Sequence, residues 1–423
     1  SYMDYSNTFC TKIKYILKGM SVLSVIGIVG EYNPFHYGHM HHIAETRKLM
    51  GENSPVVCVM SGDFIQRGEA AVYSKFARAE AAVMCGVDLV LELPLPWTLS
   101  SAEGFARGAV GLLGATGVVT HLSFGSECGE TEVFETIAET LIDPLIGAEI
   151  RAQLNADEGI PFAVARQRAV AMRIGEAASQ LETPNNILAV EYIKAIYNQG
   201  LNLKPVTIRR FGSGHDRMSD GTGHKSAAEI RRALSGGADI SGLVPEEASA
   251  VYKREDKMGR GPVTPQLLES AVMSRLRMLP PGAFAALPDA AEGLDNRIYR
   301  AAAEECSVDA ILAASKSKRY ALSRIRRMVM CAALGITAGM AADTPPYARV
   351  LAANERGCAL LREMNEKSRI PVITKPADVK NRSEECRSLF ELCSSAHDLY
   401  VLGYTARQER RGGADWRTSP KIL

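Results

Sequence analysis

The sequence predicts an α/β protein whose first part is a doubly wound parallel sheet. Between residues 24 and 125, short runs rich in valine, isoleucine and leucine alternate with longer segments of helical composition. This alternation is typical of right-handed βαβ units, which build parallel sheets. Polar sequences follow three of the expected strands, so they fall together at the edge of the sheet where such folds bind ligands.

The elements of this part follow from their local sequences. The apolar run 25–29 predicts the first strand, and residues 43–50 predict a helix. Residues 55–60 have the continuous apolar character of a buried parallel strand. The other expected elements are an alanine-rich helix at 75–85, a strand at 88–93 that Pro94 ends, a helix at 102–113 and a strand at 118–124 that Gly125 ends.

Beyond residue 125 the sequence pattern changes several times. We expect helices at about 130–200, a strand at 203–209, a glycine-rich mobile loop at 212–223 and a short helix from Ser226. The predicted regions are an extension (1–23), a first domain with a helical insertion (24–243), a helical and basic region (244–344) and a small α+β region (345–423) with strands at 371–374 and 399–402.

The composition excludes several classes of protein. The chain has 423 residues, a formal net charge of +1 and 46% hydrophobic residues, which is typical of a globular protein and not of a polycation. No apolar run approaches the roughly 20 residues that a membrane span needs. The nine cysteines form no C-x-x-C pair, which favours reduced thiols in the cytoplasm over disulfides or a zinc site.

The junction between the first strand and its helix carries an H-x-G-H sequence, formed by His36, Gly38 and His39. A helix N-terminus attracts anions because its N–H groups point outward and its dipole is positive there, and glycine lets a phosphate approach the backbone. Two imidazoles add donors for the oxygens of an attacked phosphoryl group. We therefore expect a nucleotide-phosphate site with His36 and His39 as catalytic residues. The alternatives are a metal site made by His36, His39 and His42 with Glu31 nearby, or a purely structural turn.

Later segments could complete this site. The S-x-x-E pattern at Ser226 predicts a capping box, and beside H-x-G-H it predicts that Ser226 and the open N–H groups bind a triphosphate. Lys225 or Arg231 would neutralise the charge. Two weaker segments are T-P-N-N-I-L, which contains Asn185, and the end of the late strand, which contains Arg210. Taken alone, the first segment is explained by a helix start and the second by a solvated strand edge.

Six cations lie between residues 316 and 327 with no acidic residue among them. If this run is helical, Lys316, Arg319 and Arg327 share one face of the helix. A solvated helix face and an RNA-binding surface explain such a run about equally well. The cations of this basic run are Lys316, Lys318, Arg319, Arg324, Arg326 and Arg327.

In this order, the segments resemble those of the bacterial tRNA(Met) cytidine acetate ligases, a family within the H-x-G-H nucleotidyltransferase superfamily. The resemblance depends on E-Y-N-P-F-H-Y-G-H at 31–39 and S-G-D-F-I-Q-R-G-E at 61–69, and it continues through F-G-S-E, P-N-N-I-L and S-A-A-E-I-R. It implies a nucleotidyltransferase-like first domain and a reaction in two steps. Acetate attacks the α-phosphate of ATP, giving acetyl-adenylate and pyrophosphate. The exocyclic amine of the wobble cytidine of elongator tRNA(Met) then takes the acetyl group, giving N4-acetylcytidine and AMP.

The resemblance also implies where the substrates bind. ATP, accompanied by Mg²⁺, is expected on residues 29–42, with Gly125, Asn185 and Arg210 completing its site and the basic run contacting tRNA. The loop 61–69 is a weaker candidate for contacting acetate or cytidine, because the acidic Asp63 lies in it. No resident metal is expected. The expected ATP-site residues are Val29, Gly30, Glu31, Tyr32, Asn33, Pro34, Phe35, His36, Tyr37, Gly38, His39, Met40, His41, His42, Gly125, Asn185, Arg210 and Ser226.

Two other functions fit parts of the pattern. An adenylyltransferase acting on a phosphorylated small molecule would also use H-x-G-H, but about 190 residues separate that sequence from S-A-A-E-I-R, which is more than one compact domain of that kind needs. A non-catalytic, nucleotide-sensing RNA-binding protein would also combine a phosphate site with a basic surface.

Overall fold

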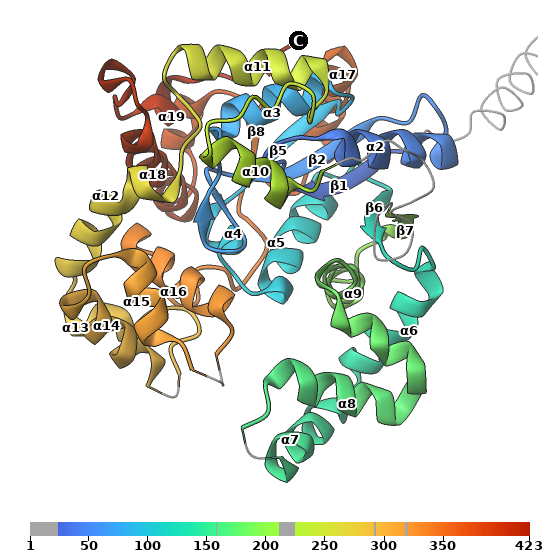
Figure 1. The fold of residues 1–423 in the computed structure, drawn as a ribbon. Helices are drawn as coiled ribbons and strands as arrows, with labels where there is room; N and C mark the ends of the chain where they lie inside the picture. The colour runs from blue at the N-terminus through green and yellow to red at the C-terminus, as the bar shows by residue number, and fades with distance from the viewer. Residues whose placement is uncertain (1–23, 158, 211–224, 292, 318–319) are drawn as a thin grey trace, which may run out of the picture.

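Strands from both ends of the chain meet in one sheet at the centre of the molecule (Figure 1). The computed structural model describes residues 24–157, 159–210, 225–291, 293–317 and 320–423. Within these residues, eight strands form the sheet in the order β10-β8-β5-β2-β1-β6-β7, with β9 paired to β8. The predicted extension 1–23 and the predicted mobile loop 212–223 lie outside the described residues.

The strands are mostly short and buried. Their bounds are β1 (Ile26–Gly30), β2 (Val56–Ser61), β3 (Phe64–Ile65), β4 (Glu69–Ala70), β5 (Leu89–Leu93), β6 (His121–Ser126), β7 (Lys204–Arg209), β8 (Ala348–Ala353), β9 (Val372–Ile373) and β10 (Lys421–Ile422). The predicted strands of the first domain and the strand at 371–374 are thereby confirmed, within one to three residues at each end. The small hairpin β3–β4 stands apart from the large sheet.

Helices make up most of the remaining chain. In the first half they are α2 (Tyr37–Met50), α3 (Lys75–Met84), α4 (Leu95–Thr98), α5 (Ala102–Ala115), α6 (Thr131–Ile142), α7 (Ile146–Ala156), α8 (Phe162–Ile174), η1 (Gly175–Glu182), α9 (Pro184–Asn198) and α10 (Ala227–Ser235). In the second half they are α11 (Glu246–Lys257), α12 (Pro265–Arg277), α13 (Pro281–Ala285), α14 (Leu294–Glu304), α15 (Val308–Ser315), α16 (Leu322–Leu334), α17 (Glu355–Lys367), η2 (Pro376–Asn381), α18 (Glu384–Tyr400), η3 (Val401–Gly403), η4 (Arg407–Glu409) and α19 (Ala414–Arg417).

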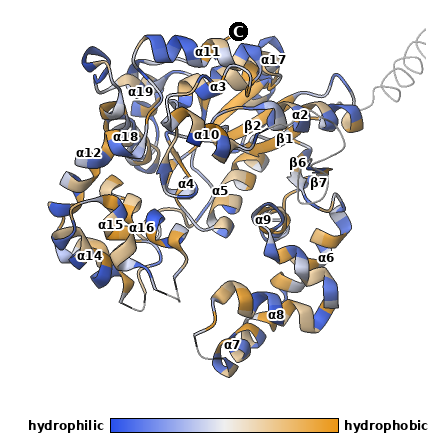
Figure 2. Cartoon of the chain, in the orientation of Figure 1, coloured by the Kyte–Doolittle hydropathy of each residue, from blue (hydrophilic) through white to orange (hydrophobic). Residues whose placement is uncertain are grey.

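Alternate residues of the central strands face two different cores. In β2, Val57 and Val59 belong to the core that contains α5 and α9, whereas Cys58 and Met60 belong to the core that contains α2, α3 and α11. Figure 2 shows the strands β1 and β2 in hydrophobic colours between helices that carry more polar surfaces. Both faces of the sheet are covered by helices, which confirms the predicted doubly wound α/β class.

The strand order creates a switch point beside β1. The chain runs from β1 outward to β2 and β5, and then returns to place β6 and β7 on the other side of β1. Strands β1, β2, β5, β6 and β7 are all parallel. Ligands of such sheets bind where the order reverses, at the carboxyl ends of the strands. This point lies between the turn after β1 and the turn after β6.

The last part of the chain completes the same sheet. Strand β8 pairs antiparallel with β5, and β10 pairs parallel with β8. The boundary predicted near residue 345 therefore does not separate two sheets, because the C-terminal strands extend the sheet that begins at Ile26.

Two local predictions differ from the structure. Residues 399–402 were expected as a strand, but α18 continues to Tyr400 and a 3-10 turn follows. Phe390, Cys393, His397 and Tyr400 are all buried at helical spacing, and a run of four apolar residues cannot reveal that periodicity. The helix expected at 43–50 begins earlier, at Tyr37, because histidine side chains form its N-terminal cap.

Two groups of helices extend from the sheet (Figure 1). Helices α6 to α8 form one of them, and α9 connects it to the sheet by packing on α5 and β6, which confirms the predicted helical character of residues 130–200. Helices α12 to α16 form the other, in the region predicted to be helical. Among the described residues, no helix is both long enough and apolar enough to cross a membrane.

Candidate active site

The turn after β1 places His36 and His39 at the beginning of α2. His36 Nδ1 accepts the backbone N–H of Gly38 at 3.0 Å, and His39 Nδ1 accepts the backbone N–H of His36 at 3.2 Å. The two imidazole rings are stacked, with their centroids 3.9 Å apart. This is a capping box in which histidines take the places that serine and glutamate usually occupy. The helix terminus therefore fixes the orientation of both rings.

The environment keeps His39 and His42 uncharged near neutral pH. Burial, with the charges of His36 and Arg210, holds the pKa of His39 well below its ordinary value, and burial with Arg210 lowers the pKa of His42 to about 4. Because Nδ1 of His39 accepts a hydrogen bond, its neutral ring carries its proton on Nε2. His39 thus presents a neutral N–H donor, which suits the oxygens of a phosphoryl group whose charge grows during attack.

Glycine is required inside the H-x-G-H turn for reasons of space. A Cβ atom on Gly38 would lie 2.9 Å from the ring of His36. Tyr32 has a left-handed backbone (φ +46°), and its buried ring contacts the rings of Phe35 and His39. Strain of this kind is retained where neighbouring groups fix the backbone. Tyr252 of α11 contributes by accepting the backbone N–H of Phe35 on its hydroxyl oxygen at 2.9 Å.

Two predicted ATP-site residues from other strands meet at this edge. The aliphatic part of Arg210 packs on Gly125, where a Cβ atom would lie 3.1 Å from Arg210 Cγ. The charge of Arg210 acts on both His39 and His42. His42 Nε2 lies 2.9 Å from Ser123 Oγ of β6, so α2 is also held to the strand on the far side of the switch point. The structure therefore brings Gly125 and Arg210 beside H-x-G-H, as predicted.

The S-A-A-E-I-R segment also reaches the turn. Arg231 of α10 donates to the carbonyl oxygen of Asn33 at 2.9 Å, and Ile230 lies in the same core as Tyr32 and Phe35. The predicted capping box is confirmed, since the Ser226 backbone N–H donates to Glu229 Oε2 at 2.8 Å and the Glu229 backbone N–H donates to Ser226 Oγ at 3.4 Å.

Asn185 lies at the beginning of α9, which starts at Pro184. Its side-chain amide donates to Glu127 Oε1 at 2.7 Å, and the Glu127 backbone N–H donates to Asn186 Oδ1 at 3.1 Å. The predicted segments F-G-S-E and P-N-N-I-L are therefore joined by direct hydrogen bonds. Asn185 lies at the same edge as Gly125, with its amide engaged by the protein.

The acidic residue of the loop 61–69 does not face this edge. Asp63 is buried, and its Oδ2 atom lies 2.8 Å from His397 Nδ1 of α18. Its Oδ1 accepts the backbone N–H of Lys75 at 2.8 Å. Asp63 therefore faces the protein interior, so the objection that it would repel an anionic substrate does not hold.

Asp63 belongs to a buried ionic network that joins the two ends of the chain. Lys75 Nζ lies 2.8 Å from Glu92 and 2.7 Å from Asp415, and the Arg349 guanidinium lies 2.8 Å from Asp415. All of these side chains are at most 5% exposed. The network holds the C-terminal segment against the loop 61–69.

The Asp63–His397 pair predicts a pH dependence of stability. Burial opposes protonation of His397, but the charge and hydrogen bond of Asp63 outweigh it, so the pKa of His397 is raised. Burial also opposes ionisation of Asp63, yet His397 and Lys75 lower its pKa, so Asp63 stays ionised near neutral pH. A raised folded pKa gives stability that is complete below the unfolded pKa of about 6.5 and is lost as pH rises through the folded value.

We therefore expect His397→Gln to lower the melting temperature most near pH 6, with the difference from the unmodified protein shrinking as the pH rises through the raised pKa of His397. Calorimetry of both proteins across this range measures the effect. A difference that widens with rising pH would contradict the assignment.

Arg78 is a structural part of the site that sequence reasoning missed. Its fully buried guanidinium donates to the carbonyl oxygens of Glu31, Ser61, Gly62 and Tyr73. It thereby ties the turn after β1 to the turn after β2. An arginine in an alanine-rich helix is a weak signal, because most helical arginines are solvated.

The basic run is not one helix. Lys316 follows the end of α15, α16 begins at Leu322, and Lys318 and Arg319 lie outside the described residues. The predicted shared face is therefore wrong, because the chain leaves the helix to bury Tyr320 before α16 starts.

All three arginines of α16 have partners in distant segments, and two of these partners are acidic. Arg326 pairs with Glu69 of β4, and Arg327, which is largely buried, lies 3.9 Å from Asp289. Arg324 donates to the carbonyl oxygen of Asp289 at 2.8 Å. Lys316 is exposed. Only the tertiary structure supplies these acidic partners, which are absent from the basic run itself.

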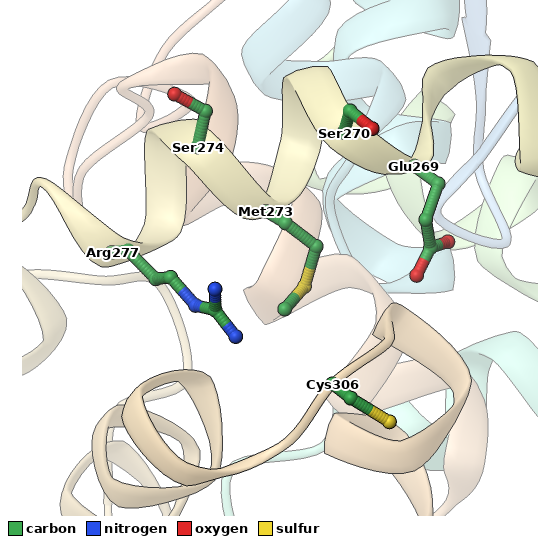
Figure 3. Close-up of a pocket in the computed structure, with 6 residues that line it drawn as sticks. All are labelled: Glu269, Ser270, Met273, Ser274, Arg277 and Cys306. Carbon is green, nitrogen blue, oxygen red and sulfur yellow. The ribbon is translucent and has the colours of Figure 1, made fainter.

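The hollows on the described surface include one beside the candidate site and one in the second half of the chain. One, of about 440 Å³, lies between α2 and β7, beside the candidate site, and is lined by His41, Glu45, Lys48, Leu49, Thr207, Ile208 and Arg209. The other, of about 330 Å³, lies among the helices of the second half of the chain (Figure 3). There Glu269 accepts the backbone N–H of Val308, and Arg277 donates to the carbonyl oxygen of Glu305. Both charged groups of the second hollow thus have protein partners, and we assign it no ligand.

The donor set at the candidate site consists of imidazoles and the guanidinium group of Arg210. Across the part of the chain that the structure describes, no group of three or more histidine, cysteine, aspartate or glutamate side chains is arranged to hold a metal ion. Such donors bind anions rather than cations. The arrangement can hold a polyphosphate and stabilise charge on it.

Comparison with known proteins agrees with this geometry. Residues 23–415 match the family model described as HIGH Nucleotidyl Transferase. A tRNA(Met) cytidine acetate ligase from Caldanaerobacter subterraneus subsp. tengcongensis is 38% identical over 388 residues, which cover 90% of this chain and 96% of that protein. The chain belongs to the tRNA(Met) cytidine acetate ligase family. A member of the same name from Syntrophomonas wolfei subsp. wolfei is 35% identical and covers 94% of this chain and 99% of its own length.

Solved structures of the family share the fold. A crystal structure of Thermotoga maritima TmcAL bound with alpha-thio ATP has a TM-score of 0.88 to this structure and 31% sequence identity, and the match covers 95% of this chain and 99% of that one. These findings confirm the predicted family and the predicted nucleotidyltransferase-like α/β fold.

Proposed function

We propose that this protein is an ATP-dependent ligase that activates acetate as acetyl-adenylate and acetylates N4 of the wobble cytidine of elongator tRNA(Met). The observation that carries the proposal is the H-x-G-H cap at the switch point of the sheet, where His39 presents a neutral donor beside Arg210. The family supports it, since relatives that match nearly the whole chain bear the name of this activity. Because ATP and tRNA are its substrates, we expect the protein in the cytoplasm.

The first step needs positioning and charge stabilisation more than proton transfer. An acetate oxygen attacks the α-phosphorus of ATP, and the bond from that phosphorus to the pyrophosphate oxygen breaks. Acetate is already a nucleophile, so no general base is required. We assign the phosphate contacts to His36, His39 and Arg210, and the wider ATP site to residues 29–42, Gly125 and Asn185. Ser226 is assigned as a further contact at the beginning of α10.

In the second step the cytidine amine attacks the carbonyl carbon of acetyl-adenylate. The bond from that carbon to the phosphate oxygen breaks, AMP leaves, and the amine loses a proton. The donors that stabilised the α-phosphate also stabilise the departing AMP, because its charge develops on the same oxygens.

Mg²⁺ is proposed as a companion of ATP and not as a resident ion. The site supplies nitrogen donors, and the Glu31 carboxylate already accepts the backbone N–H of Gln66 at 2.7 Å. Mg²⁺ prefers oxygen ligands, and in phosphate-transfer sites it takes many of them from the phosphates and from water. The residues present therefore fit Mg²⁺ that is bound to the phosphates of ATP and not held by protein ligands alone.

The test is to incubate the purified protein with ATP, labelled acetate and bulk tRNA, and to analyse the nucleosides. Acetate-dependent N4-acetylcytidine is expected only when all three substrates are present. An adenylyltransferase for small molecules would release pyrophosphate only when a phosphorylated acceptor is added, and it would leave the tRNA unlabelled. A nucleotide-sensing RNA-binding protein would bind ATP and tRNA without turnover. Either outcome would reject the ligase.

We further propose that the basic run contributes to tRNA binding, with exposed Lys316 as its most accessible cation. In filter binding of bulk tRNA over a series of salt concentrations, Lys316→Glu is expected to weaken tRNA binding and to lower the slope of log affinity against log salt by about one or more. Lys380→Glu, at an exposed position of η2, is the matched control. Equal slopes in the two variants would show that Lys316 is a solvated residue that does not contact tRNA.

A further inference from the structure

We propose that Arg67, at the tip of the β3–β4 hairpin, binds the carboxylate of acetate and holds it for attack on the α-phosphorus. The proposal rests on the proposed function and adds to it the residue that receives the second substrate.

The hairpin that carries Arg67 is held firmly on the side of α16. Its turn closes with a hydrogen bond from the Gly68 backbone N–H to the carbonyl oxygen of Ile65 at 2.9 Å. Gly68 has a left-handed backbone (φ +78°), and a Cβ atom there would lie 2.7 Å from the backbone of Arg326. The adjacent Glu69 forms an ion pair with the Arg326 side chain. Residue 67 therefore stands on a rigid support.

The opposite side of the hairpin is attached to the H-x-G-H turn. The backbone N–H of Gln66 donates to Glu31 Oε1 at 2.7 Å, and the Gln66 side chain donates to the carbonyl oxygen of Ser100 at 3.1 Å. Glu31 directly follows β1 and opens the turn that leads to His36. The residue next to Gln66 in the chain is thereby placed beside the nucleotide turn.

Of the three arginines around Glu31, Arg67 is the one not committed to the protein. Burial raises the pKa of Glu31, and the charges of Arg78, Arg231 and Arg67 oppose that effect. Arg78 donates to backbone carbonyl oxygens, and Arg231 donates to Asn33. Arg67 is exposed, and within the described residues its side chain makes no ion pair or hydrogen bond.

The chemistry of acetate requires such a group. Acetate offers only a methyl group and a carboxylate, and it must approach an anionic triphosphate, so its charge has to be compensated by a cation that the nucleotide does not use. A guanidinium pairs with a carboxylate through two parallel hydrogen bonds, which also fixes the plane of the attacking oxygens. Asp63, the one acidic residue in the loop 61–69 before Glu69, faces the buried network and not this tip.

The experiment measures acetate-dependent exchange of labelled pyrophosphate into ATP with the full-length protein. Arg67→Ala is expected to raise the KM for acetate about 10- to 100-fold, with the KM for ATP changed less than about twofold. Arg67→Lys should recover part of the loss, because it keeps the charge and loses the two-pronged geometry. Arg356→Ala, an exposed arginine of α17, is the matched control and should behave like the unmodified protein. Melting curves of the variants verify that they are folded.

Each other result overturns the assignment. An unchanged KM for acetate in Arg67→Ala means that another group binds acetate. An equal rise in the KM values for acetate and ATP places Arg67 in the nucleotide site. An unchanged KM for acetate with weakened tRNA use makes Arg67 an RNA contact. If the unmodified protein shows no acetate-dependent exchange, the proposed function itself fails, which distinguishes that failure from a misassigned residue.

Discussion

Replacing His39 by asparagine is expected to slow acetyl-adenylate formation by about 10²- to 10³-fold, the usual effect of losing one preorganised donor at a developing charge. The side-chain oxygen of asparagine can take the place of Nδ1 and accept the backbone N–H of His36, so the cap of α2 is kept. The donor at the position of Nε2 is lost. The change therefore separates the catalytic role of the ring from its capping role.

Single-turnover formation of acetyl-adenylate measures this rate, and filter binding measures tRNA affinity. Affinity for tRNA should stay within about twofold, because the basic run is not altered. His121→Asn is the matched control, since His121 begins β6 at the opposite edge of the sheet. An unchanged adenylation rate, or a collapse of tRNA binding, would show that His39 has been misassigned.

Replacing Asp415 by alanine is expected to destabilise the protein by about 3–5 kcal/mol, the cost of removing one partner from a buried ion pair. Asp415 has no exposed surface, and its Oδ2 atom lies 2.7 Å from Lys75 Nζ and 2.8 Å from Arg349 Nη1. Without it, two buried cations share the Glu92 carboxylate. The penalty arises because the buried positive charge is then only partly compensated and has no water to solvate it.

Urea denaturation of the variant and the unmodified protein measures this difference. Asp378→Ala, at an exposed position of η2, is the matched control and should change stability by less than about 0.5 kcal/mol. Asp415→Asn, which keeps the shape but not the charge, should fall between the two. A loss below about 1 kcal/mol for Asp415→Ala would mean that the network does not hold the C-terminal segment in place.

Much of the first domain could be predicted because its signals are local. Continuous apolar runs predict the strands at 25–29 and 55–60, and the alternation of strands with helices predicts that the strands are parallel. Once the strands are parallel, H-x-G-H and Gly125 must lie at the same edge. This reasoning led to Gly125 at the edge that carries the histidines, whereas Arg210 was expected there only from the family resemblance; the structure places Arg210 against Gly125 and its charge near His39.

Other features could not be predicted because they depend on residues far apart in the chain. Asp63 looked like an acid facing an anionic substrate, but its partner His397 lies 334 positions later. The basic run looked uncompensated, but Arg326 meets Glu69, 257 positions earlier. The run 399–402 looked like a strand, although buried neighbours at helical spacing make it the end of α18.

The sequence by itself determined the fold class, the family and the position of the H-x-G-H turn, because apolar periodicity, glycine requirements and a contiguous motif each lie within a few neighbouring residues. Only the tertiary structure shows which charged groups form hydrogen bonds or ion pairs within the protein and which are left exposed for substrates. Arg78 and Arg231 are committed to backbone carbonyl oxygens, Asp63 is committed to His397, and Arg67 is left exposed beside the turn. A charge has a partner or lacks one only in three dimensions, because electrostatic interactions act through space and not along the chain.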